Sequence, residues 1–345
     1  MSNSSLSQDR LLSRREFLKF SGISLMGLIL PPIRGLREFI SDQQGRVIDP
    51  KISVYDIPSF EGEEVEVYWK DMVLPIDEVT VGDEEPAYNR IWYKLGDVGY
   101  AHSGAIQPVK TQLNEPAEKI PLQGVLAEVT VPFTDAHWGP GKDYPFAYRF
   151  YYETTYWVAA KDQDRFGDLW YGLLDDKWDF TLYVPATHLR IVPDEELTPL
   201  SADLPPAAKR IEVINSQQLV VAYEWEHPVF MARAATGAKF SNGRYMTPAG
   251  RHMTFHKRPT RHMAAGNLAA NGYDLPGVPW ISYITESGIA FHGTYWHNDY
   301  GRPRSHGCIN LTSRAAKWIY RWTLPVVPPD QQRVYEDFGT RVDVI

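Results

Sequence analysis

The only thiol of the chain lies close in sequence to two histidines, a combination that could carry nucleophilic chemistry. Cys308 is the single cysteine among 345 residues, and His306 and His292 precede it by two and sixteen positions. A free thiol has a pKa of about 8.5 and is mostly protonated at neutral pH. A neighbouring imidazole can accept the thiol proton and can later protonate a leaving amine. The pattern therefore predicts a thiolate nucleophile at Cys308 that is activated by a histidine.

Glycines beside both histidines give the backbone the freedom that such a site needs. Gly293 follows the first histidine, and Gly307 directly precedes the cysteine. Glycine permits tight turns and close approach of the backbone to a ligand. Backbone N–H groups around Gly307 could form an oxyanion hole. A third group must then hold the far ring nitrogen of the catalytic imidazole.

The same residues allow two other interpretations. Cys308 could be a buried, inert thiol, which is the usual role of an isolated cysteine. His292, His306 and Cys308 could also hold one zinc ion, with water as the fourth ligand. We favour catalysis, because the thiol is embedded between histidine and glycine neighbours and nothing else at the motif indicates a Lewis acid.

The other histidines of the C-terminal half are expected to lie outside the chemistry. His252, His256 and His262 are four and six positions apart, which invites a metal hypothesis. Pro259 predicts a turn among them, and a turn would remove them from one strand face, so we favour hydrogen-bonding or surface roles. His297 is expected to be a surface group.

The composition excludes several classes of protein. One cysteine permits no intramolecular disulfide and no zinc site built from several thiolates. The chain has 43 acidic and 35 basic residues and a formal charge of −8, so nucleic acid is not an expected partner. With 20 Tyr, 14 Phe, 11 Trp, 26 Pro and 25 Gly, the composition favours short strands and turns. We therefore predict a mainly β protein.

Residues 1–40 are typical of an export signal. Arg14 and Arg15 form a twin-arginine pair, and the apolar stretch from Phe20 to Leu30 follows. As a helix this stretch would span about 16 Å, whereas a bilayer core needs about 30 Å. It therefore predicts a signal-peptide core, with membrane contact only if the segment stays uncleaved. The alternative is a chance arginine pair before a buried helix.

Two aromatic segments in the first half of the body resemble each other. Residues 91–109 and 169–192 each contain a Trp-Tyr strand, a turn and a second strand with an apolar tail. Such a repeat predicts two copies of one small β module. The segments resemble bacterial SH3-like modules, which we place at 50–112 and 120–193. The alternative is that the two segments are unrelated aromatic hairpins. If they are SH3-like modules, their possible ligands are components of the cell wall.

A proline-rich and acidic stretch at 194–208 predicts a linker to a C-terminal domain at 209–345. This domain begins with alternating strands joined by polar turns. One helix is expected, with Ser313 as its cap and Pro325 after its end. Its apolar face consists of four residues, namely Ala315, Trp318, Ile319 and Trp322.

The C-terminal domain resembles the catalytic domain of the L,D-transpeptidase family. His292-Gly293, eleven further residues and then Ser305-His306-Gly307-Cys308-Ile309-Asn310 match the signature of that family. Thr247-Pro248-Ala249-Gly250 resembles its TPxG turn, and residues 274–280 resemble the segment before the first catalytic histidine. The resemblance covers roughly residues 209–345 and implies a β-sandwich catalytic domain.

The resemblance implies a role for each motif residue. Cys308 would be the nucleophile and His292 its base, with the Gly293 carbonyl orienting the far ring nitrogen. His306 would support the site by hydrogen bonding. Backbone N–H groups of Gly307 and Cys308 would stabilise the oxyanion.

Further residues would hold the motif and the substrate. Ser305 and Asn310 would hold the catalytic turn, and residues 258–280 would form a flap over the donor peptide. Arg304 could bind a stem-peptide carboxylate, and Tyr283 could supply a hydroxyl to the oxyanion. The substrate-binding candidates are Asn310, Arg304, Tyr283, Trp280 and Trp296.

The implied activity is peptidoglycan cross-linking outside the membrane. The thiolate would attack a tetrapeptide stem and release its terminal D-Ala, and an amine of a second stem would then form a 3→3 cross-link. The resemblance implies neither metal nor organic cofactor. The alternatives are hydrolysis of the same thioester, as in an L,D-carboxypeptidase, and a non-catalytic wall-binding protein. A papain-like protease fits less well, because His292 precedes Cys308 here.

Overall fold

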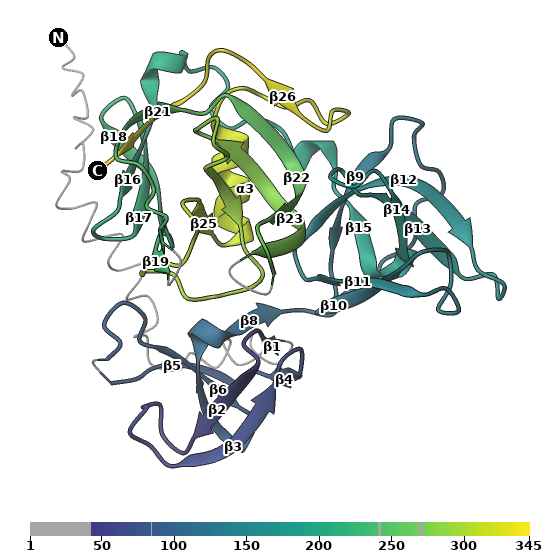
Figure 1. Ribbon diagram of the computed structural model, residues 1–345, viewed down its shortest axis with the longest axis horizontal. Coiled ribbons are helices and arrows are strands. Elements are labelled where there is room, and N and C mark those ends of the chain that lie inside the picture. Colours follow the sequence, from purple (N-terminus) through teal and green to yellow (C-terminus); the bar gives the residue numbers. More distant parts are fainter. Residues whose placement is uncertain (1–42, 84, 241–242, 269–271) are drawn as a thin grey trace, which may run out of the picture. The chain divides into compact units, whose positions relative to one another are not determined.

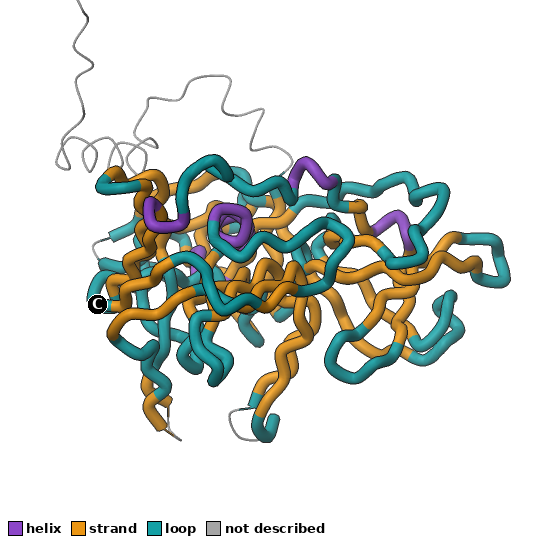
Figure 2. The backbone as a smooth tube through the Cα atoms, turned by 90° about the horizontal axis from the view of Figure 1, so that it is seen from above, coloured by secondary structure: helices purple, strands orange, loops and turns teal. Residues whose placement is uncertain are grey.

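Strands far outnumber helices in the described chain, which confirms the prediction of a mainly β protein (Figures 1 and 2). The computed structural model describes residues 43–83, 85–240, 243–268 and 272–345. The predicted export segment, residues 1–40, lies outside these residues. No helix within the described ranges is long and apolar enough to cross a membrane.

The first module consists of a three-stranded sheet, in the order β4-β1-β8, and a five-stranded sheet, in the order β3-β2-β7-β6-β5. Its strands are β1 (Gln44–Val47), β2 (Lys51–Tyr55), β3 (Glu64–Trp69), β4 (Val73–Pro75), β5 (Glu78–Val81), β6 (Ile91–Leu95), β7 (Gly99–His102) and β8 (Ile106–Val109). The module therefore begins before the predicted boundary at residue 50. No pattern in residues 44–47 predicts β1, because this strand is short and is defined by its pairing with β4 and β8.

The second module is a seven-stranded sheet in the order β11-β10-β14-β13-β12-β9-β15. Its strands are β9 (Val125–Val129), β10 (Phe133–His137), β11 (Phe146–Tyr151), β12 (Thr155–Gln163), β13 (Leu169–Leu174), β14 (Thr181–Pro185) and β15 (Leu189–Ile191). All of them lie within the predicted range 120–193.

The two modules repeat one pairing scheme. In each, a hairpin leads into a one-turn 3₁₀ helix and a short last strand, as β6-β7-η1-β8 and β13-β14-η2-β15, where η1 is Ser103–Ala105 and η2 is Ala186–His188. The last strand then pairs antiparallel with the first strand of its own module. The repeat seen in the sequence is thus a repeat in topology, whereas the SH3-like assignment stays a prediction.

The predicted linker is packed against the domains on both sides of it. It contains the 3₁₀ turns η3 (Asp194–Glu196) and η4 (Pro206–Ala208). Arg190 and Lys317 pair with the Glu196 carboxylate, and the Arg190 hydrogen bond is the main reason that its pKa falls to about 2. Leu197 is buried in the core of the C-terminal domain. Despite its linker-like composition, segment 194–208 is therefore fixed by contacts with the neighbouring domains.

Two five-stranded sheets form the C-terminal domain, as the predicted sandwich requires. One has the order β18-β17-β16-β27-β21, and the other has the order β25-β24-β23-β22-β26. The first contains β16 (Lys209–Ile214), β17 (Leu219–Glu224), β18 (His227–Arg233), β21 (Gly250–Met253) and β27 (Arg341–Val344). The second contains β22 (His256–Ala265), β23 (Tyr273–Tyr283), β24 (Ala290–Gly293), β25 (Ile309–Leu311) and β26 (Val334–Tyr335). A small ribbon consists of β19 (Lys239–Phe240) and β20 (Gly243–Arg244). Apolar side chains of both large sheets share one core.

The expected helix is α3 (Ser313–Trp322), which packs against β23 and β24 (Figure 1). Its cap is Thr312, whose side chain accepts a hydrogen bond from the Ala315 amide, so the prediction of Ser313 as the cap is wrong by one residue. The Ser313 hydroxyl instead donates to the Glu153 carbonyl of the second module.

The turn between β13 and β14 holds the middle of the β22–β23 hairpin. The imidazole of His262 lies between the carboxylates of Asp175 and Asp274 and bonds to both. Asp176 pairs with Arg258 and Arg261 of the same hairpin at 2.5 and 2.6 Å. The second module therefore fixes the hairpin that the sequence analysis assigned to the flap.

We predict that the His262 contact stabilises the protein more at about pH 6 than at about pH 9. Burial lowers the pKa of His262, but its two carboxylate partners outweigh burial and raise it. A raised native pKa means that this stabilisation is complete below the unfolded value of about 6.5 and is lost as pH rises through the native pKa. Thermal unfolding of His262→Gln should show the larger loss at the lower pH. Equal losses at both pH values would contradict the prediction, and the exposed His227→Gln is the control.

Candidate active site

Cys308 lies in a pocket of about 340 Å³ on the C-terminal domain. This pocket brings together most of the residues that the sequence analysis assigned to the site. Its lining consists of Phe240, Met263, Tyr273, Leu275, Ser287, Gly288, Ile289, His292, Trp296, Arg304, Ser305, His306, Cys308 and Asn310. The pocket is therefore built by β24, by the segment leading into β25 and by the β22–β23 hairpin.

The pairing of β24 with β25 places the base beside the nucleophile. The two strands run parallel, with Phe291 opposite Ile309 and His292 opposite Asn310. Cys308 directly precedes β25 and so lies level with Ala290, two residues before His292 along β24, and the side chains of Cys308 and His292 both line the pocket. Parallel neighbours in a sheet are separated by about 4.8 Å. This register brings together two residues that are sixteen positions apart in the chain.

The turn that carries Cys308 is held by two hydroxyl groups. Ser305 Oγ accepts a hydrogen bond from the Gly307 amide at 3.1 Å and donates to the Cys308 carbonyl at 2.6 Å. Thr247 Oγ1, from the TPxG motif, donates to the Gly307 carbonyl at 2.7 Å. Gly307 has φ = +114°, a conformation that favours glycine. The Gly307 N–H therefore already has a partner, which argues against its predicted use as an oxyanion donor.

His292 is buried and is oriented by the backbone. Its Nδ1 lies 2.9 Å from the Gly293 carbonyl, the contact that the family resemblance implied. A carbonyl only accepts, so Nδ1 carries the ring proton and Nε2 keeps a free lone pair. Burial lowers the pKa of His292 to about 4, although the Gly293 carbonyl acts in the opposite direction. At neutral pH the imidazole is therefore neutral and suited to accept a proton.

The Cys308 thiol is protonated in the resting protein. Burial raises its pKa to about 11, although the backbone amide of Ala290 acts in the opposite direction. Its Sγ lies 3.7 Å from the Gly288 carbonyl. A thiol with this pKa next to a neutral imidazole is not a preformed ion pair. The proton must therefore move to His292 as sulfur attacks the substrate.

His306 supports the pocket by stacking. Its ring lies parallel to Phe240 with centroids 4.3 Å apart, and Tyr245 and Tyr273 complete an aromatic cluster. Its Nε2 is buried and has no hydrogen-bond partner among the described residues. The predicted hydrogen-bonding role is therefore corrected to a packing role. The sequence could not show this, because the aromatic partners come from distant segments.

A third histidine belongs to the site and was missed by the sequence analysis. His297, expected at the surface, is buried, and its Nε2 lies 3.0 Å from the side-chain amide of Asn310. Burial, and then the charge of Arg304, lowers its pKa to about 3. His297 thus ties the loop after β24 to β25. No spacing in the sequence indicates this contact.

Three of the predicted substrate-binding residues line the pocket together with His292, namely Asn310, Arg304 and Trp296. Trp296 places its ring centroid 5.7 Å from that of the imidazole. Arg304 also faces the pocket, but its guanidinium pairs with the buried Asp299 carboxylate at 2.9 Å. A substrate carboxylate would therefore share Arg304 with Asp299.

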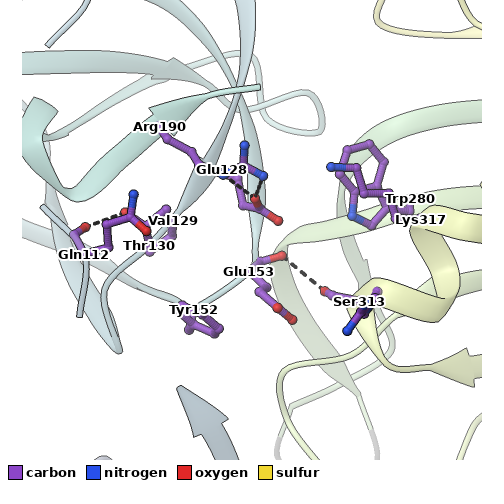
Figure 3. A pocket seen from close by; sticks show the side chains of 11 residues that line it. Gln112, Glu128, Val129, Thr130, Tyr152, Glu153, Arg190, Trp280, Ser313 and Lys317 are labelled. Carbon is purple, nitrogen blue, oxygen red and sulfur yellow. Dashed lines mark hydrogen bonds and ion pairs between the residues drawn. The ribbon is translucent and has the colours of Figure 1, made fainter. Parts of the chain in front are cut away.

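Trp280 lies elsewhere, so the prediction that it lines the cleft around Cys308 is wrong. Its side chain is fully buried, with its ring 5.4 Å from that of Tyr320 on α3. It lines a separate cavity of about 260 Å³ between the second module and α3, next to Lys317 (Figure 3). In this cavity, burial raises the pKa of Glu153 to about 7. Trp280 is thus a packing residue of the domain interface.

The β22–β23 hairpin contains most of the predicted flap at 258–280 and forms one wall of the pocket. Met263, Tyr273 and Leu275 of this hairpin line the pocket. Tyr283 stacks on His256 with centroids 4.8 Å apart. Burial raises the pKa of Tyr283, and the nearby Cys308 adds to this increase. Its use as an oxyanion donor stays a prediction.

The remaining metal hypotheses receive no support from the geometry. Within the described residues, no group of three or more His, Cys, Asp or Glu side chains is arranged to hold a metal ion. His262, one of the three histidines in the metal hypothesis, bonds to two aspartates through its two ring nitrogens.

Solved structures similar to the chain include L,D-transpeptidases of three bacteria. A mutant of the Enterococcus faecium L,D-transpeptidase is 22% identical and covers 40% of this chain and 50% of its own, with a TM-score of 0.31. L,D-transpeptidase 3 of Mycobacterium tuberculosis is 20% identical over 48% of this chain and 74% of its own, with a TM-score of 0.32. An L,D-transpeptidase of Mycobacterium smegmatis is 16% identical over 56% of this chain and 89% of its own, with a TM-score of 0.32. The chain thus spans about half the length of the first of these structures.

The part of the chain that matches a known protein family contains the Cys308 pocket. No curated protein matches the sequence significantly. Residues 208–344 match the model of the YkuD family, described as the L,D-transpeptidase catalytic domain. This range contains every residue that lines the Cys308 pocket. The resemblance found in the motifs is confirmed, and residues 208–344 carry an L,D-transpeptidase catalytic domain of the YkuD family.

Proposed function

We propose that this protein is an exported L,D-transpeptidase that forms 3→3 cross-links between peptidoglycan stem peptides through a thioester on Cys308. The observation that carries the proposal is the position of Cys308 beside a neutral, backbone-oriented His292 in one pocket. This pocket lies within the segment that matches the YkuD family. The chemistry needs one thiol, and the chain has one.

In the first step, Cys308 Sγ attacks the carbonyl carbon that precedes the terminal D-Ala of a tetrapeptide. His292 Nε2 accepts the thiol proton, because its Nδ1 is engaged by the Gly293 carbonyl. The Cys308 amide is the motif N–H proposed to stabilise the oxyanion, since the Gly307 amide donates to Ser305. The C–N bond then breaks, and His292 returns the proton to the departing D-Ala amine.

In the second step, an amine of another stem attacks the thioester carbonyl. The new C–N bond forms, the C–S bond breaks, and His292 transfers the amine proton to the leaving sulfur. Water in place of the amine would give an L,D-carboxypeptidase. The two activities therefore share every residue up to the thioester and differ only in the molecule that resolves it.

The cell envelope is the proposed location. Supporting this, Arg14 and Arg15 form a twin-arginine pair, and the proposed substrate lies outside the cytoplasmic membrane. The shared pairing scheme of the two modules supports the proposal that they are SH3-like copies. We propose that they contact the wall.

Product analysis separates the two outcomes of the thioester. Purified protein incubated with a tetrapeptide stem should give a 3→3 linked dimer and free D-Ala, measured by mass spectrometry. The protein without peptide and the peptide without protein are the controls. Free tripeptide with no dimer, in the presence of an amine acceptor, would overturn the transpeptidase proposal in favour of hydrolysis.

Replacing the nucleophile tests the thioester itself. Cys308→Ala should lose the acyl adduct on a tetrapeptide donor while its melting temperature stays close to that of the wild type, since the thiol makes only weak polar contacts, with the Gly288 carbonyl at 3.7 Å and with the Ala290 amide. Intact-protein mass spectrometry measures the adduct. A folded Cys308→Ala variant that still releases D-Ala would contradict the mechanism.

Alkylation tests the protonation state of the thiol. Since burial raises the pKa of Cys308 to about 11, the rate of reaction with iodoacetamide should rise about tenfold per pH unit from about pH 7 to about pH 10. Every adduct reports this site because the chain has one cysteine. A cysteine peptide, whose rate levels off near about pH 8.5, is the control. A rate for the protein that is constant between about pH 7 and about pH 9 would show a preformed thiolate instead.

A further inference from the structure

A second pocket, of about 300 Å³, adjoins the Cys308 pocket and is built by all three domains. The first module contributes Lys70, the second contributes Tyr148 and Tyr151, and the catalytic domain contributes Leu275 and Trp296. The last two side chains also line the Cys308 pocket. The two pockets are therefore neighbours that share one wall.

The shared wall lies beside the catalytic base. Trp296 is 5.7 Å from His292 between ring centroids and packs edge-on against Tyr295 at 5.0 Å. Tyr295 in turn stacks on Tyr151 of the second module at 5.2 Å. An unbroken row of aromatic rings thus leads from His292 into the second pocket.

Arg46 holds the three domains together at this pocket. Its guanidinium bonds to Gln107 and Asp71 of the first module and to the Tyr295 carbonyl of the catalytic domain, at 2.7 to 3.1 Å. It also lies 4.1 Å over the Tyr151 ring. Arg46 is almost completely buried. The buried, hydrogen-bonded guanidinium of Arg46 therefore fixes the first module against the pocket.

Lys70 is the one cation in the lining of this pocket that has no partner among the described residues. Arg46 pairs with Asp71 at 2.9 Å, and Arg149 pairs with Asp135 at 2.7 Å. The one acidic group of the lining, Asp274, is bonded to His262 and to the Tyr148 hydroxyl. The pocket therefore presents an aromatic wall and one free, exposed ammonium group, which together suit a peptide that carries a carboxylate.

We propose that this second pocket binds the acceptor stem peptide and that Lys70 binds a carboxylate of that peptide. The attacking amine must give its proton to His292, so it approaches on the side of the base. Trp296 places the second pocket on that side. Lys70 is thus a substrate-binding residue supplied by the first module. The inference rests on the proposed function, because it names the site of the second substrate.

The kinetic test compares Lys70→Glu with the wild type on both half-reactions. The KM for the acceptor in cross-linking should rise about tenfold, less so at high salt, while the rate of thioester formation on the donor stays unchanged. Lys110→Glu, an exposed lysine of the same module outside the pocket lining, should leave both values unchanged. An unaltered acceptor KM in Lys70→Glu would overturn the proposal. A slower thioester formation would also overturn it, because it would assign the pocket to the donor.

A binding test separates this inference from the proposed function. Calorimetry should show that an acceptor tetrapeptide binds Cys308→Ala protein and that adding Lys70→Glu weakens the affinity about tenfold. If acceptor binding depends on Lys70 but the wild type forms no thioester, the acceptor pocket would be supported and the proposed transpeptidase function would be rejected. If the wild type forms cross-links but acceptor binding does not change in Lys70→Glu, the transpeptidase proposal would stand and the acceptor pocket would be rejected.

Discussion

The parallel pairing of β24 with β25 is the constraint on which the active site depends. It sets His292 opposite Asn310 and leaves Cys308 just before β25, in the same pocket as the base. Parallel pairing allows no tight hairpin, so the connection between the strands must be long. That connection carries Trp296, His297 and Arg304, and the contacts of these residues hold it against both strands. One strand register therefore creates both the catalytic pair and the wall beside it.

Removal from water determines the charge states of His292 and Cys308. A carbonyl rather than a carboxylate orients His292, so no negative charge stabilises an imidazolium, and desolvation lowers its pKa to about 4. The same desolvation raises the pKa of Cys308 to about 11. Both partners are therefore neutral at rest, and charge develops only during attack. In an oxidising environment a protonated thiol is also less easily oxidised than a thiolate.

The modules take part in the geometry of the site. Asp175 and Asp176 of the second module hold the β22–β23 hairpin through His262 and Arg261. The first module is docked through the buried Arg46. Each of these contacts is a charge-assisted hydrogen bond in a poorly hydrated place, where geometry matters more than in water. The flap and the second pocket thus depend on residues outside the segment that matches the YkuD family.

The sequence by itself determined the β class, the helix of the C-terminal domain, the repeated modules and the candidate catalytic pair. These follow from local alternation, residue type and motif spacing, which need no knowledge of distant partners. Only the tertiary structure decided that Trp280 packs against α3, that His306 stacks instead of donating a hydrogen bond, and that His297 is buried. It also revealed β1, whose four residues become a strand by pairing with segments far along the chain. Packing and pairing of this kind depend on which distant side chains meet, and that is set by the fold as a whole.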